Sequence, residues 1–200
     1  MEKPSSAAPP ARFIAALESI RSGDYPRHAA LEEIPAPTRA AAFAVALEAR
    51  VPAGSEDESA SGTFVLLHEP GGHVVWDGDF RIVTVAKATL EPELGADPFV
   101  AEVSWSYLAE ALELESLPRA ELAGTVTRTV SESFGALRAR GPSVGVEVRA
   151  SWTPDGPAIG PQLAAWLGFL TQLGGVEPLP PGVSPLRPAG VDQPSLSGLG

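Results

Sequence analysis

The stretch that decides the fold is residues 63–90, TFVLLHEPGGHVVWDGDFRIVTVAKATL. Its two ends, 63–68 and 80–90, are rich in Val, Ile, Thr and Phe, residue types that are favoured in β-strands. Between them, Pro70-Gly71-Gly72 and Trp76-Asp77-Gly78-Asp79 are two turn signals on either side of a short extended piece. Strands that follow one another through turns, without a helix between them, pair antiparallel. The stretch therefore predicts a strand, a turn region and a return strand within an antiparallel sheet.

Three further strands and three helices are predicted on either side of this stretch. Apolar and polar residues alternate over 43–51 and again over 144–152, which is the pattern of a half-buried strand, and 122–131 is predicted as another strand. Apolar residues at helical spacing predict helices near the N-terminus, after Asp97-Pro98 and before Gly174-Gly175. The resulting order is α-β-β-β-α-β-β-α. It predicts an α+β fold with a single antiparallel sheet of about five strands and three helices.

This order of elements is similar to that of the type III secretion chaperone-like fold, whose members are small, acidic and often dimeric. The similarity is one of topology and charge, and a fold by itself does not fix a function. It favours a protein that acts by binding another protein or a second copy of itself.

The length and the two ends of the sequence indicate one domain. A chain of 200 residues is of ordinary size for a single domain. Residues 1–10 are small, polar and Pro-rich, and we expect them to be disordered. Residues 11–176 are predicted to form the domain. Residues 177–200 contain six Pro and four Gly and are predicted to form a flexible tail.

Charge and composition argue against several classes of function. The formal net charge of −11 leaves no basic surface for the phosphate backbone of a nucleic acid. The absence of cysteine excludes disulfides, thiolate nucleophiles and zinc–thiolate sites. No apolar run is long enough to span a bilayer. We therefore expect a cytoplasmic protein that binds neither nucleic acid nor membrane.

A set of short motifs is more specific than the order of elements. The motifs are LLHEPGGH over 66–73, WDGDFR over 76–81, Ile34-Pro35-Ala36-Pro37, Ser131-Glu132-Ser133-Phe134-Gly135 and Ala150-Ser151-Trp152-Thr153-Pro154. Together they resemble an uncharacterised actinobacterial family catalogued as domain of unknown function 3000. The resemblance covers about residues 11–183. It implies a single domain of actinobacterial, cytoplasmic origin, and it implies no catalytic residue.

The best candidate for chemistry is a group of imidazoles and carboxylates in the same stretch: His68, Glu69, His73, Asp77 and Asp79. Such groups could bind zinc or another divalent ion and leave a coordination position open for water, with Glu69 as a base. The helical zinc signature needs its two histidines four residues apart, whereas His68 and His73 are five apart and Pro70-Gly71-Gly72 lies between them. A hairpin could still bring both rings together, but a structural hairpin with satisfied histidines is the simpler interpretation.

Trp105 is the remaining candidate contact residue. It lies off the apolar stripe of its predicted helix, next to Tyr107, where an aromatic side chain could anchor an interface. No cofactor is predicted. The favoured hypothesis is a non-enzymatic protein-binding or chaperone-like module, with self-association or a protein partner. The alternatives are a metal-dependent hydrolase and a small-ligand-binding protein that use His68, His73 and Asp77.

Deletion of residues 177–200 should leave the cooperative unfolding transition almost unchanged, because this segment has few apolar groups to bury. Urea unfolding of the full chain and of the truncated chain would measure the difference. A loss of several kcal/mol would contradict the prediction, since it would mean that Leu179, Val183 and Leu186 dock on the domain.

Overall fold

The structure is a computed structural model, and it describes residues 8–26, 29–52, 58–91, 97–115 and 117–175. The predicted tail, 177–200, and most of the predicted disordered N-terminus, 1–10, lie outside these residues. The expected domain boundaries at residues 11 and 176 therefore stay predictions.

The described residues form one antiparallel sheet and three α-helices. In chain order the elements are α1 (Ala11–Arg21), β1 (Ala30–Ile34), β2 (Phe43–Pro52), β3 (Glu58–His73), β4 (Gly78–Leu90), α3 (Val100–Leu114), β5 (Arg119–Ser131), the short 3₁₀ helix η1 (Gly135–Arg140), β6 (Ser143–Pro154) and α4 (Ile159–Leu173). The sheet has six strands in the order β1-β2-β3-β4-β6-β5. The α+β fold with three helices on a single antiparallel sheet is thus confirmed.

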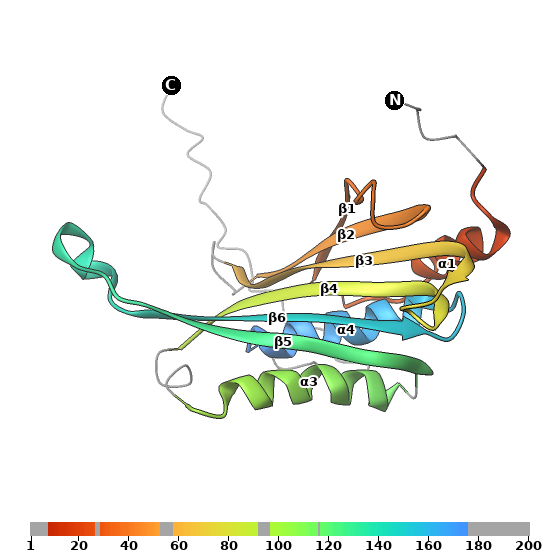
Figure 1. Cartoon of the computed structure of the whole chain (residues 1–200). Coiled ribbons are helices and arrows are strands. Elements are labelled where there is room, and N and C mark those ends of the chain that lie inside the picture. The colour runs from red at the N-terminus through yellow and green to blue at the C-terminus, as the bar shows by residue number, and fades with distance from the viewer. Residues whose placement is uncertain (1–7, 27–28, 53–57, 92–96, 116, 176–200) are drawn as a thin grey trace, which may run out of the picture.

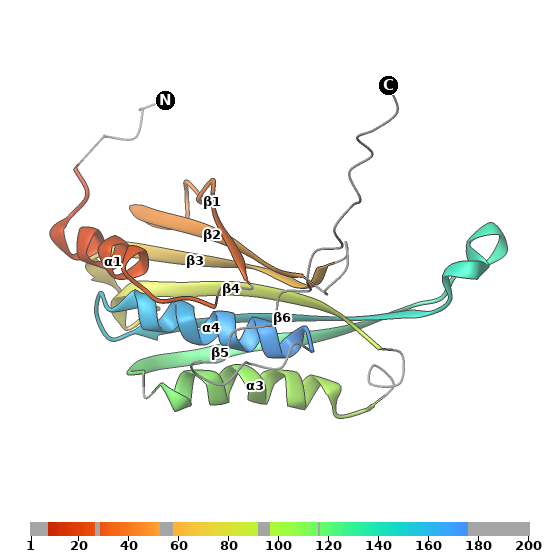
Figure 2. The same cartoon turned by 180° about the vertical axis from the view of Figure 1, so that it is seen from behind.

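All three helices lie on the same face of the sheet (Figures 1 and 2). Helix α4 runs across β2, β3 and β4, while α3 packs on β5 and β6, and α1 packs against α4. The opposite face, which we call the open face, is covered by no described helix (Figure 1). The fold is therefore a two-layer structure whose core lies on one side of the sheet.

The core is built around α4 and two tryptophans. Trp152 of β6 and Trp166 of α4 are fully buried, and both rings pack against Phe64 of β3, with centroids 6.3 and 5.6 Å away. The indole Nε1 of Trp152 donates a hydrogen bond of 2.8 Å to Oε1 of the buried Gln162 on α4. This bond satisfies two polar groups that would otherwise be buried without a partner.

The close approach of α4 to the sheet depends on Gly62 of β3. A Cβ atom at this position would lie 2.8 Å from Cζ2 of Trp166 and 2.5 Å from the backbone oxygen of Val85. Neither atom has room to retreat, because Trp166 is fully buried and Val85 belongs to a paired strand. A glycine is therefore required where the largest side chain of α4 meets the sheet.

Two details of the sequence prediction are corrected by the structure. The prediction of about five strands missed β1, whose sequence ALEEI lacks a clean alternation because β1 is a short edge strand with two exposed glutamates. Pro70-Gly71-Gly72 was expected to form a turn, but it lies within the end of β3, and the chain reverses at residues 74–77 instead. The pairing of β3 with β4 is irregular between His68 and His73.

The substitution Gly62→Ala should lower the free energy of unfolding by about 1–3 kcal/mol, because the added methyl overpacks the contact with Trp166. Urea unfolding would measure it. Gly168→Ala is the matched control: a Cβ there meets nothing within 4 Å, and the residue lies inside α4. It should be neutral or stabilising by up to about 1 kcal/mol. Equal effects of the two substitutions would contradict the proposed role of Gly62.

Candidate functional site

Four of the five candidate residues of the hairpin lie in β3 and β4, and Asp77 lies in the turn between these strands. His68 and Asp79 lie beside the core, next to α1. Glu69, His73 and Asp77 lie on the outside of the hairpin, half-buried or exposed. The structure therefore divides the predicted group into two parts.

His68 is a core residue. It is only 1% exposed, and its ring stacks on Phe80 with centroids 4.4 Å apart, while Phe13 of α1 and Phe43 of β2 lie at 5.8 and 6.3 Å. Its Nδ1 lies 2.9 Å from the backbone oxygen of Asp79. A carbonyl oxygen can only accept, so we assign the proton to Nδ1. The other nitrogen, Nε2, is buried and has no partner among the described residues.

Asp79 attaches α1 to the hairpin. Its carboxylate accepts two hydrogen bonds from Arg12 of α1, from Nε at 2.6 Å and from an Nη at 3.1 Å. The Arg12 guanidinium also lies over the ring of Phe80, 5.7 Å from its centroid. The hydrogen bond and the charge of Asp79 raise the pKa of Arg12. The Asp79 carboxylate thus has a structural partner in Arg12, and its role as a ligand or partner contact stays a prediction.

The outer residues of the hairpin have local roles as well. The ring of His73 stacks on Trp76, with centroids 4.4 Å apart. A carboxylate oxygen of Glu69 accepts a hydrogen bond of 3.1 Å from the backbone N–H of Ala42. Asp77 has a positive φ of 53°, a conformation that Asp tolerates in turns. His73, Glu69 and Asp77 therefore each have a structural role in the hairpin tip.

The separation of His68 and His73 determines whether the two rings can bind the same metal ion. One ring is enclosed by aromatic side chains on the core side, and the other is exposed and stacked on Trp76. Within the ranges that the structure describes, no group of three or more His, Asp or Glu residues is placed to hold a metal ion. A site that activates water through these two histidines would need both rings at one ion, and this geometry does not provide that.

Trp105, the remaining candidate contact, packs against β5. It is half-buried at the boundary of the core, and a Cβ atom on Gly124 of β5 would lie 2.6 Å from its Cζ3. It therefore positions α3 on the edge strand. A role as a contact for a partner stays a prediction.

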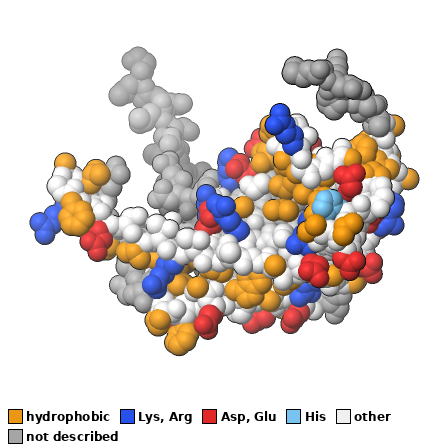
Figure 3. Space-filling model, viewed as in Figure 1, with side chains coloured by type: hydrophobic (Ala, Val, Ile, Leu, Met, Phe, Trp, Pro, Cys, Tyr) orange, Lys and Arg blue, Asp and Glu red, His pale blue; other side chains and the backbone are white. Residues whose placement is uncertain are grey.

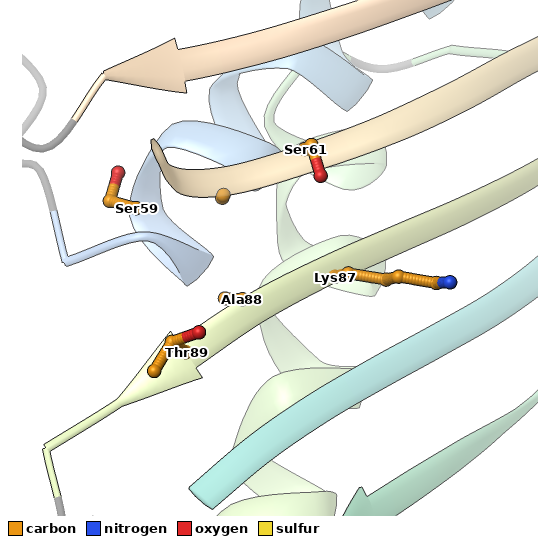
Figure 4. Close-up of a pocket in the computed structure, with 6 residues that line it drawn as sticks. Ser59, Ser61, Lys87, Ala88 and Thr89 are labelled. Atoms are coloured by element: carbon orange, nitrogen blue, oxygen red, sulfur yellow. The ribbon is translucent and has the colours of Figure 1, made fainter. Parts of the chain in front are cut away.

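A shallow pocket of about 250 Å³ lies at the far end of β3 and β4 (Figure 4). It is lined by Ser59, Ala60, Ser61, Lys87, Ala88 and Thr89. The amine of Lys87 lies 3.3 Å from a carboxylate oxygen of Glu147, and the hydroxyl of Ser59 donates to the backbone oxygen of Val51. In Figure 4 the Lys87 side chain points away from Ser59 and Thr89. A nucleophile with an adjacent base is not formed by these residues.

The sequence analysis did not single out the polar residues of the open face as candidate contacts. Arg81 of β4 donates to the hydroxyls of Thr153 at 3.0 Å and Ser151 at 2.7 Å, and partial burial lowers its pKa. Glu147 of β6 forms ion pairs with Arg149, at 2.6 Å, and with Lys87, and the hydrogen bond from Arg149 is the main reason why the pKa of Glu147 is lowered. The signal in the sequence is the alternation in 144–152, which places Glu147, Arg149 and Ser151 on the side away from the core.

The comparison with known families matches one family over most of the chain. The profile of the protein family of unknown function DUF3000 matches residues 9–184. The chain belongs to the DUF3000 family. The matched segment contains every element from α1 to α4, and so the family extends over both layers of the fold.

No curated protein and no solved structure matches the chain. The similarity to the type III secretion chaperone-like topology therefore stays a prediction. No helix in the described part of this DUF3000 protein is long and apolar enough to cross a membrane.

His68→Ala and His73→Ala should have different effects on stability. His68→Ala removes a buried ring from an aromatic cluster and should lower the free energy of unfolding by about 2 kcal/mol or more. His73→Ala removes an exposed ring and should change it by less than about 0.5 kcal/mol. Thermal unfolding with and without a chelator would measure both. A shared loss of stability that depends on a metal ion would contradict this interpretation, because a bound ion stabilises the fold by mass action.

Proposed function

We propose that this DUF3000 protein is a non-enzymatic protein-binding module, which acts by association through the open face of its sheet. The proposal rests on one observation: three helices cover one face of the six-stranded sheet, and no described element covers the other. A sheet face that lacks a covering layer is free to bind a partner.

The middle of the open face carries apolar residues in register. Val65 of β3 lies opposite Val83 of β4, and Val85 follows on the same face. Val83 is 37% exposed, while Val65 and Val85 are half-buried. These three valines form a contiguous apolar strip over β3 and β4, and Ala46, which pairs with Val65 from β2, is already buried beside it. A partner that covered this strip would remove it from water, which is favourable.

Polar residues surround the apolar strip. In the register of β4 and β6, Lys87 lies opposite Glu147, and Val85 lies opposite Arg149. Arg81 lies at the other end of the strip, bonded to Ser151 and Thr153. Figure 3 views this face, on which charged side chains lie among apolar ones. An apolar centre with a polar rim is the usual arrangement of a protein–protein interface.

The hairpin chemistry gives no competing proposal. A hydrolase or a small-ligand site at His68, His73 and Asp77 would need these groups to face one another, and His68 lies in the core while His73 and Asp77 lie outside it. Binding through a surface needs no catalytic group. The proposal keeps the cytoplasmic location and the absence of nucleic-acid binding that the charge and composition predict.

Sedimentation at micromolar concentration should give a mass above the 20.7 kDa of one chain, and Val83→Glu should reduce that mass. The substitution would place a carboxylate in the apolar strip, and binding of a partner would remove water from this charge, which is unfavourable. Val103→Glu is the matched control, because Val103 lies on α3 and is 41% exposed, close to the 37% of Val83. It should leave association unchanged.

Two outcomes would contradict the proposal. The first is a wild-type chain that stays a monomer and co-purifies with no partner. The second is a monomer that associates only after residues 177–200 are deleted, which would assign the open face to that segment of the same chain.

A further inference from the structure

Strands β5 and β6 continue past the end of β4 as a projecting hairpin (Figure 1). The last residue of β4, Leu90, pairs with Val144 of β6, and beyond this pair β5 and β6 share only the pair Ser131–Ser143 before the connection 132–142 begins. The chain between the two strands contains the short helix η1. We call residues 130–144 the arm. It projects away from both layers of the fold, as both views show (Figures 1 and 2).

The tip of the arm carries large apolar side chains that bury little surface in this chain. Phe134 is 75% exposed, Leu137 is 51% exposed, and Val130 at the base of the arm is 58% exposed. Arg138 lies beside them in η1 and is exposed too, in a chain whose formal net charge is −11. Apolar side chains gathered on a projecting tip contribute nothing to the core, and such exposed patches mark interaction sites.

A second exposed apolar group lies at the opposite end of the sheet. Val74 and Val75, in the turn between β3 and β4, are 99% and 77% exposed. Asp77 and Glu69 place two carboxylates at the same hairpin tip. Strand β4 has this turn at its start and the arm beside its last residue, so the two groups lie at opposite ends of the strands. The arm carries the cation Arg138 beside its apolar side chains, with the exposed carboxylate of Glu132 nearer its base, and the hairpin tip combines its apolar side chains with carboxylates.

We propose that the arm tip of one chain docks on the β3–β4 hairpin tip of a second copy of the chain. The proposal rests on the association through the open face proposed above, and it identifies the partner and the contacts. When two open faces meet with their strands antiparallel, a two-fold axis across the strands brings each arm to the end of the sheet that carries the hairpin tip of the other copy. Phe134 and Leu137 then cover Val74 and Val75, and Arg138 approaches Asp77.

The second copy is favoured as the partner because one chain carries both halves of the contact. A two-fold interface requires surfaces that complement themselves, and contacts at both ends of a closed dimer occur twice. Binding of a different protein would account for the exposed apolar residues of the arm or of the hairpin tip, but it would not account for the position of the two groups at opposite ends of the open face. The net charge of −11 opposes docking of the arm on an anionic lipid surface.

Complementation between two variants tests the contact. The arm variant is Phe134→Ser/Leu137→Ser, and the hairpin variant is Val74→Ser/Val75→Ser. All four side chains are more than half exposed, so each variant should fold like the wild type. Circular dichroism would check the folding. In either homodimer both contacts contain one altered partner, and the dissociation constant should rise about tenfold or more. In a mixture of the two variants, the heterodimer keeps one unaltered contact and should form more tightly than either homodimer.

The possible results distinguish the arm contact from the association through the open face. Leu114→Ser is the control, because Leu114 lies on α3, outside both contacts, and is 84% exposed; it should leave the dissociation constant unchanged. A dimer that Val83→Glu disrupts, but that neither the arm nor the hairpin variant weakens, overturns the arm contact and leaves the open face as the interface. Weakened homodimers without recovery in the mixture also overturn it. A wild-type monomer overturns the arm contact, and a wild-type monomer that also co-purifies with no partner overturns both proposals.

Discussion

The structure depends on the packing of a single helix, α4, against the sheet at Gly62. Trp166 reaches the sheet only because Gly62 has no side chain, and this contact sets the distance between the two layers. The other two helices take their places from α4, since α1 and α3 both pack against it. Helix α4 is buried along nearly its whole length, and it holds Gln162 against the indole of Trp152. Dense packing of this kind leaves little freedom for the layers to slide.

The position of α1 explains why the candidate histidine is structural. When α1 packs beside α4, its Phe13 comes next to the ring of His68 and its Arg12 reaches Asp79. The imidazole is then enclosed by three phenylalanines and by the Asp79 backbone oxygen, which holds Nδ1. The buried Nε2 without a partner is an energetic cost that the surrounding aromatic contacts offset. A residue that could have been a ligand is thereby used to seal one end of the core.

Much of the fold could be predicted from the sequence wherever apolar residues recur at a regular spacing. The alternation in 144–152 placed Trp152 inside and Glu147 and Arg149 outside, and the spacing before Gly174-Gly175 predicted the buried face of α4 with Trp166. Strand β1 was missed because an edge strand pairs on one side only and tolerates exposed glutamates.

The candidate site was harder to predict, because closeness in the sequence does not determine on which face of the sheet a side chain lies. His68 and His73 are five residues apart, so regular alternation would put them on opposite faces, and the irregular pairing between them removes even that guide. Asp79 was proposed as a ligand, but its partner, Arg12, is 67 residues away and becomes visible only when α1 is placed. The arm was missed for a similar reason: Phe134 and Leu137 are residue types typical of a core, and they are exposed because the connection between β5 and β6 projects past the end of β4.

The layering also accounts for where charge lies in this acidic protein. With the helices on one face, carboxylates such as Glu102, Glu110 and Glu113 gather on the outer surface of α3, while Arg81, Lys87 and Arg149 lie on the open face with Glu147. Two chains that each carry a net charge of −11 repel one another at long range. An arrangement that keeps the acidic helix layer outward and brings the more balanced open faces together reduces that repulsion. Charge distribution and exposed apolar residues thus favour the same face for association, although they arise from different parts of the sequence.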